Sequence, residues 1–170
     1  MNKFSKIVIV SNEDKSRGPM TAAIFGSLLK DRGFIIESRG LVVLFPEPYN
    51  PKAIEIGKEK GMNLQSTFSR QLEASDFGLN SLVLTMEEGQ KEKIYAKYPT
   101  ARNVFTLCEF AGDTGKIIPN PYGKDEAAYR ECFDELYSVV FKASDVLLGE
   151  RKTMQEKNNT GGYLDDSDRK

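Results

Sequence analysis

The sequence predicts an α/β fold in three layers: a four-stranded parallel sheet with helices on both faces. Apolar segments rich in Val and Ile alternate with amphipathic segments along residues 4–148, as in sheets built from strand–helix–strand units. The 170 residues are 39% hydrophobic and 29% charged, an ordinary balance for a globular domain. Because no repeat or linker divides the chain, we expect one domain over residues 1–150 and a polar, disordered tail over 151–170.

The first strand is expected over residues 4–10, because FSKIVIV is an apolar run typical of a strand buried on both faces. The pattern becomes helical at Gly18, with Pro19 in the first turn, and ends at Gly33. The same reasoning predicts further strands over 34–38, 82–86 and 103–107, helices over 51–60, 87–98 and 127–148, and a short helix and turn within 69–80.

The turn after the first strand is the first candidate site. Ligands of parallel sheets bind at the carboxyl ends of strands, and a helix N-terminus favours a phosphate. The chain has neither GxxxxGK[ST] nor GxGxxG here, so no nucleotide cofactor is indicated. What remains over residues 11–17 is a serine, five residues and an arginine, SNEDKSR.

Five segments, in the same order, resemble the low-molecular-weight protein tyrosine phosphatases. In that family a strand ends in the cysteine of a C-x5-R-[ST]-P loop. The resemblance covers residues 4–148 and is carried by SRGPMTAAIF, NPKAIEIGKEKG, SRQL, LVLTMEE and IPNPYGKDEAAYRECFDEL.

The resemblance implies a mechanism and a set of positions. A thiolate attacks phosphorus, backbone N–H groups and an arginine hold the phosphoryl oxygens, and an aspartic acid protonates the leaving group. The catalytic positions are then Ser11, Arg17 and Asn120, and Ser38 matches a serine that braces the loop. The resemblance places phosphate binding at Asn12, Glu13, Asp14, Lys15, Ser16, Arg17 and Gly18.

Several of these positions depart from the family pattern. Ser11 stands for the cysteine, Glu13 for a glycine, Asp14 for an asparagine, Gly18 for Ser or Thr, and Asn120 for the acid. A serine hydroxyl needs a neighbouring base, and the chain has no histidine. Two carboxylates near a phosphate dianion add repulsion. We therefore predict a pseudophosphatase that is inactive or very weak and has a phospho-ligand-binding or regulatory role.

Other interpretations remain open at these residues. Ser11 is also an ordinary turn residue, and Arg17 has two uses, an ion pair with Glu13 or Asp14 or the binding of an anion. Phe45 and Tyr122 form either the rim of a phosphotyrosine slot or local packing. Glu13 and Asp14 alone offer too few oxygen ligands for a metal ion, so none is expected.

Two other activities compete with the inactive reading. The first is an active phosphomonoesterase that uses Ser11 or water. The second is an arsenate reductase, which shares the fold but needs a cascade of thiols. The two cysteines, Cys108 and Cys132, lie outside the loop and are expected to be reduced core thiols.

Charge and hydropathy limit the partners. The net charge is −1, so no basic field indicates nucleic acid, and no apolar run of membrane-spanning length occurs. We expect a cytoplasmic protein whose partner is a phosphotyrosine protein or inorganic phosphate, with no nucleic acid and no membrane.

Overall fold

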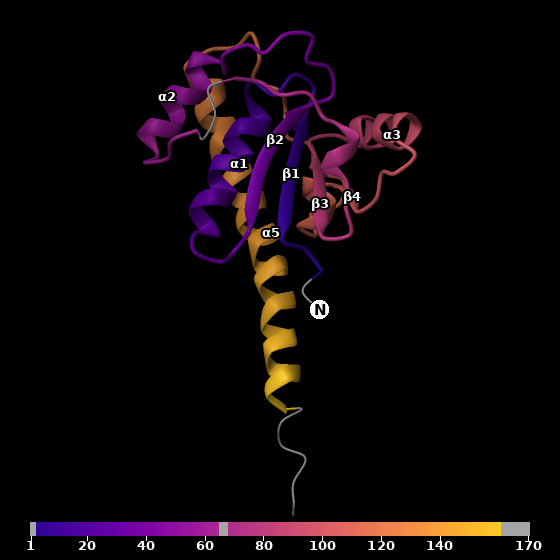
Figure 1. The fold of residues 1–170 in the computed structure, drawn as a ribbon. Coiled ribbons are helices and arrows are strands. Elements are labelled where there is room, and N and C mark those ends of the chain that lie inside the picture. Colours follow the sequence, from indigo (N-terminus) through magenta and orange to yellow (C-terminus); the bar gives the residue numbers. More distant parts are fainter. Residues whose placement is uncertain (1–2, 65–67, 161–170) are drawn as a thin grey trace, which may run out of the picture.

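The computed structural model describes residues 3–64 and 68–160, with side chains as far as Gly149. The sheet contains β1 (Lys6–Ser11), β2 (Ile35–Gly40), β3 (Ser81–Thr85) and β4 (Val104–Thr106). All pairings are parallel, in the order β2-β1-β3-β4 (Figure 1). This confirms the predicted fold class and places β1 in the middle of the sheet.

Helices cover both faces of the sheet. On one face lie α1 (Arg17–Leu28) and α5 (Glu126–Thr160), and α2 (Pro51–Glu59) packs against both. The other face is covered by α3 (Glu88–Lys97) and by the segment that holds the short helix η1 (Ala74–Asp76) (Figure 1). A short helix that the sequence did not predict, α4 (Leu107–Phe110), follows β4 directly and packs against α5.

Strand β1 is buried on both faces, which explains its continuous apolar run. Ile7 and Ile9 belong to the core cluster that contains α1 and α5, while Val8 and Val10 belong to the smaller cluster on the α3 side. Side chains alternate between faces along a strand, so both sides of β1 are anchored. Ser11, at its carboxyl end, is therefore held in a fixed place at the top of the sheet.

Helix starts follow the predicted chemistry. The Asn50 side chain accepts a hydrogen bond from the Lys52 N–H at 2.9 Å, and Pro51 opens α2, as the sequence predicted. At α3, Glu87 and Gln90 form a capping box, each side chain accepting from the other's backbone N–H.

Two boundaries differ from the prediction by more than two residues. Helix α1 ends at Leu28, because Asp31 (φ 60°) and Gly33 (φ 77°) take left-handed backbone conformations. Helix α5 continues to Thr160, so residues 151–160 are helical, while a polar tail beginning at residue 151 stays a prediction. Residues 161–170 lie outside the described residues, and the domain boundary at 150 stays a prediction.

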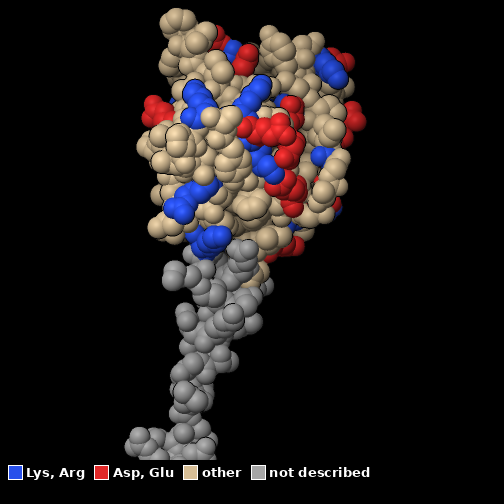
Figure 2. Space-filling view, turned by 90° about the vertical axis from the view of Figure 1, so that its right-hand side faces the viewer, with Lys and Arg blue, Asp and Glu red and all other residues tan. Residues whose placement is uncertain are grey.

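The surface is mixed in charge. On the face that carries α3 and β4, acidic side chains gather in one group with lysines and arginines around it (Figure 2). No helix within residues 3–64 and 68–160 is long and apolar enough to cross a membrane.

Candidate phosphate-binding site

A small pocket of about 120 Å³ opens where β1 passes into α1. The structure brings together eight of the residues singled out in the sequence, from two segments more than a hundred residues apart. The lining consists of Ser11, Asn12, Glu13, Lys15, Ser16, Arg17, Asn120 and Tyr122. Four other positions named from the sequence do not line this pocket: Asp14, Gly18, Ser38 and Phe45.

Ser11 turns its hydroxyl toward the loop and the first turn of α1. The hydroxyl oxygen accepts a hydrogen bond from the Asp14 N–H at 3.2 Å. A Cβ added at Gly18 would lie 2.6 Å from this oxygen. The Ser11 hydroxyl thus occupies the space that a side chain at position 18 would need. Ser11 and Gly18 form a matched pair, and restoring the family's Ser or Thr at 18 requires Ser11 to rotate.

Asp14 lies beneath the loop and is fully buried. Its backbone is left-handed, with φ 58°, a conformation that Asp and Asn tolerate better than most residues. Its Oδ2 accepts a hydrogen bond from the Arg70 N–H at 2.9 Å, while Oδ1 has no hydrogen-bond partner among the described residues. The expectation that this carboxylate faces a bound phosphate is therefore wrong.

Burial raises the pKa of Asp14 from 3.8 to about 6. The loss of solvation penalises the charged form. The Ser38 hydroxyl, the Arg70 amide and the charges of Arg39 and Arg70 lower the pKa but offset only part of this effect.

Two hydrogen bonds fix the Arg17 side chain. One Nη donates to the Ile118 carbonyl at 2.9 Å, and the other donates to a Glu87 carboxylate oxygen at 2.7 Å. Neither of the partners suggested from the sequence, Glu13 and Asp14, pairs with it. The guanidinium has five N–H donors, and the rest of them have no partner within the described part of the chain. The arginine lines the pocket, but Glu87 offsets its charge.

The mouth of the pocket carries a second, exposed charge cluster. Lys15 forms an ion pair with Glu47 and lies 3.7 Å from a Glu13 carboxylate oxygen. The hydrogen bond to Glu47 is the main reason that the pKa of Lys15 is raised. Two carboxylates face one lysine here, so the mouth offers no net attraction for a phosphate dianion.

The opposite wall comes from the segment before α5. The Asn120 side-chain oxygen accepts a hydrogen bond from the Tyr122 N–H at 3.2 Å, which is a common turn arrangement for asparagine. Both side chains are exposed, and both line the pocket. An amide at this place has no acidic proton to give to a leaving group.

Hydrogen bonds from three helices hold the loop in place. The Ser16 and Tyr129 hydroxyls lie 3.0 Å apart. The Gln90 amide donates to the Asn12 side chain at 2.9 Å, and the Lys15 carbonyl accepts from the Asn50 N–H at 2.9 Å. Helices α5, α3 and α2 thus each fix one part of the loop.

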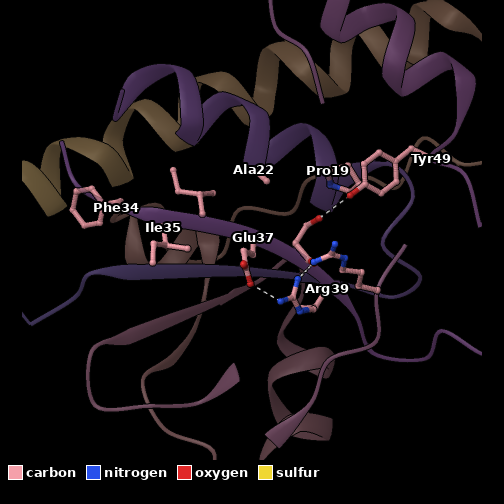
Figure 3. A pocket seen from close by; sticks show the side chains of 10 residues that line it. Pro19, Ala22, Phe34, Ile35, Glu37, Arg39 and Tyr49 are labelled. Carbon is pink, nitrogen blue, oxygen red and sulfur yellow. Dashed lines mark hydrogen bonds and ion pairs between the residues drawn. The ribbon is translucent and has the colours of Figure 1, made fainter. Parts of the chain in front are cut away.

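A separate cavity of about 420 Å³ lies along the edge strand β2. Figure 3 shows Phe34 and Ile35 at one end of it and Tyr49 at the other, with Glu37 and Arg39 as an ion pair between them. Ser38 and Tyr49 share a buried hydrogen bond of 3.3 Å here. No residue of the 11–17 loop lines this cavity, and Ser38 lines it rather than the phosphate pocket.

Both cysteines are buried and neither forms a disulfide, which confirms them as core thiols. Burial raises the pKa of Cys108, and it raises the pKa of Cys132 to about 12. Neither thiol lines the pocket at the loop. Metal-ligating side chains form no group of three or more in the part of the chain that is described.

Sequence reasoning missed the partners of the loop. Glu87, Gln90 and Tyr129 each contact it, yet none was singled out. The available signal was position: Glu87 lies two residues after the end of β3, which is the parallel neighbour of β1. The carboxyl ends of neighbouring parallel strands meet at one edge of the sheet.

The site combines the end of a parallel strand, a short loop that ends in an arginine, and the N-terminus of a helix. This combination is typical of α/β phosphatases. The family model for low molecular weight phosphotyrosine protein phosphatase matches residues 6–157. The chain belongs to this family.

Curated and solved relatives agree with the family. The low molecular weight protein-tyrosine-phosphatase PtpB of Staphylococcus aureus is 28% identical over 142 residues, which are 84% of this chain and 99% of that protein. The arginine phosphatase YwlE of Geobacillus stearothermophilus is 27% identical, with a TM-score of 0.80 over 87% of this chain and 96% of its own.

A third similar structure is a YwlE Cys-to-Ser mutant. It is described as having a phosphorylated active-site serine. It is 26% identical, with a TM-score of 0.79 over 86% of this chain and 98% of its own.

Proposed function

We propose that this protein binds a phosphorylated side chain or inorganic phosphate at residues 11–17 and hydrolyses phosphate esters very slowly or not at all. One observation carries the proposal. The pocket keeps an oriented arginine and a braced loop, but holds the Ser11 hydroxyl and the Asn120 amide where the family has a thiol and a carboxylic acid.

The chemistry lacks two contributions. No described side chain accepts a hydrogen bond from the Ser11 hydroxyl, so nothing is in place to remove its proton. Asn120 cannot protonate a leaving oxygen, and general acid catalysis contributes about 10²–10⁴-fold to a rate. Both losses act on the same reaction, so their effects on the barrier accumulate.

Binding is expected to be weak as well as unproductive. The charge of Arg17 is offset by Glu87, and that of Lys15 by Glu47 and Glu13. The loop amides and the helix N-terminus then supply most of the attraction for a phosphate. Phosphotyrosine is the first ligand to test, because the family description names it; phosphoarginine is the second, because similar structures are named arginine phosphatases.

Turnover of para-nitrophenyl phosphate tests the proposal, with Ser11→Ala and Arg17→Ala as matched variants. We expect the unmodified protein and both variants to show the same background rate. Orthophosphate binding, followed by calorimetry, should be present in the unmodified protein and absent in Arg17→Ala. Turnover well above background that disappears in both variants would establish an active phosphomonoesterase and overturn the proposal.

A second candidate is supported by the similar structure with a phosphorylated serine. In this reaction the Ser11 oxygen forms a bond to phosphorus, the ester bond of the substrate breaks, and the serine proton ends on the leaving oxygen. The phosphoserine would persist, because Asn120 cannot activate a water. Intact mass after incubation with an aryl phosphate reports it: one added phosphoryl group, absent in Ser11→Ala, supports this candidate, and an unchanged mass rejects it.

A further inference from the structure

A groove of about 630 Å³ runs from the loop to α3, and the fold and the proposed function leave it unexplained. One wall is the segment 41–45, LVVLF, and the other wall is the outer side of α3. Asn12, Glu13 and Lys15 line both this groove and the candidate phosphate pocket. The groove is thus continuous with the mouth of that pocket.

The segment 41–45 exposes more apolar surface than its position requires. Val42 is 61% exposed, Leu44 82% and Phe45 75%. Large apolar side chains gathered in one exposed segment are uncommon on a monomer and usually mark a contact surface. Phe45 belongs to this groove, not to the rim of the phosphate pocket as the sequence suggested.

The backbone holds this segment against the loop. The Leu41 N–H donates to the Ser11 carbonyl at 2.9 Å, and the Val42 N–H donates to the Asn12 carbonyl at 3.2 Å. The Gln71 side chain accepts from the Val43 N–H at 2.7 Å and donates to the Leu41 carbonyl at 2.8 Å. These bonds keep the apolar side chains outward, so their exposure is built into the fold.

The α3 wall has the opposite chemistry. Lys93 and Lys97 line the groove and are exposed. Neither has a carboxylate partner among the described residues, although Lys91, on the same helix, pairs with Glu88 and Glu109. Lys97 lies over the Tyr98 ring, and both lysines remain free of carboxylates among the described residues. Beside an apolar wall they complement a segment that carries both apolar and acidic side chains.

We propose that this groove binds the chain that flanks the phosphorylated residue of a partner protein. The flank would carry apolar side chains against residues 42–45 and acidic side chains beside Lys93 and Lys97. The proposal rests on the proposed function, because the phosphorylated residue occupies the pocket at Arg17. It adds the specificity: a phosphorylated residue within a few positions of an apolar and acidic stretch.

Peptide binding measured by fluorescence anisotropy tests this. The probes are phosphotyrosine peptides in which Leu-Leu-Glu-Glu stands after or before the phosphotyrosine, the same peptides with Ser-Ser-Lys-Lys, and the unphosphorylated forms. We expect at least one Leu-Leu-Glu-Glu order to bind about tenfold or more tightly than its Ser-Ser-Lys-Lys counterpart.

Groove variants locate the effect. Leu44→Ser with Phe45→Ser, and separately Lys93→Glu with Lys97→Glu, should each remove most of that preference and leave orthophosphate binding unchanged. One matched control is Leu79→Ser, which is exposed at the other end of the sheet. The other is Lys30→Glu with Lys58→Glu; Lys30 follows the end of α1, Lys58 lies on α2, and both are exposed. Both controls should keep the preference.

The outcomes separate the two proposals. Equal binding of both flanks, or a preference that survives both groove variants, overturns the groove and leaves the phosphate site standing. If the unmodified protein shows no orthophosphate binding, the proposed function is rejected instead. A dimer in sedimentation that the Leu44→Ser, Phe45→Ser variant dissociates would assign the groove to a second copy of the chain and also overturn the proposal.

Discussion

The buried underside of the 11–17 loop and its exposed mouth differ in what they retain. The underside holds Asp14 on the Arg70 amide, Ser16 against Tyr129, and Arg17 against Glu87 and Ile118. The mouth carries Glu13 and Asn120 where the resemblance expects a glycine and an acid. The contacts that hold the loop are retained, apart from the unpaired Asp14 Oδ1, while groups that would do chemistry are replaced. Folding and catalysis therefore place separate demands on the same seven residues.

The largest effect should come from restoring the family residues at positions 11, 18 and 120 together. In Ser11→Cys, Gly18→Ser, Asn120→Asp, a thiolate and an acid become available, and a side chain at 18 turns residue 11 away from α1. We expect turnover of para-nitrophenyl phosphate to rise by at least about 10²-fold, the lower range for general acid catalysis alone.

The control for this restoration adds Arg17→Ala, which should abolish the gain. A folded triple variant that shows no turnover would mean that the underside does not hold the loop in a binding geometry, and the comparison between the two regions would fail.

The second effect is the contribution of Asp14 to the pH dependence of the unfolding free energy. Its pKa rises from 3.8 to about 6 on folding, so the folded chain binds more protons at this site between these values. Stability from this group is therefore lost as the pH rises through that window, and above pH 6 the cost is about 3 kcal/mol. Asp14→Asn should remove this cost.

Urea unfolding at two pH values measures it. Asp14→Asn should be more stable than the unmodified protein at pH 7.5, by up to about 3 kcal/mol, and equal to it near pH 3.5. A variant that is less stable at pH 7.5 would show that the charged carboxylate is needed beneath the loop.

The sequence predicted which residues form the pocket, but it did not predict where each side chain points. The resemblance located Ser11, Arg17 and Asn120, which line one pocket. It could not show that Asp14 points downward, because that follows from a left-handed φ of 58°. It also missed Glu87, since that residue reaches Arg17 only through the parallel pairing of β1 and β3.

The helix end shows a similar limit. Residues 151–160 read RKTMQEKNNT, and their polarity favoured a tail. Lys, Glu, Gln and Met are nevertheless good helix formers, so a helix that is already started can continue through them. Polarity therefore located the end of the apolar core and not the end of α5.

A third effect isolates one brace of the underside. Tyr129→Phe removes the hydroxyl that lies 3.0 Å from the Ser16 hydroxyl, and both groups are buried. We expect a loss of about 1 kcal/mol in unfolding free energy. A double-mutant cycle with Ser16→Ala checks it: losses that simply add would show that the two hydroxyls do not interact.

The smallest effect should come from the mouth. Glu13→Gln removes one carboxylate of the exposed cluster while Lys15 keeps Glu47. We expect orthophosphate to bind about three- to tenfold more tightly, because exposed charges interact weakly in water, with unfolding free energy unchanged. Calorimetry in low and high salt measures it, and an affinity gain that persists in high salt would argue against an electrostatic cause.

The central claim is that the loop backbone still converges on an anion without performing chemistry. Amide chemical shifts of residues 12–17, followed by NMR during an orthophosphate titration, test it most directly. The account predicts saturable shifts confined to these amides and to those of neighbouring residues, weaker in Arg17→Ala, with no Ser11-dependent turnover in the same sample. Unchanged loop amides at saturating phosphate, in a protein that is folded, would contradict it.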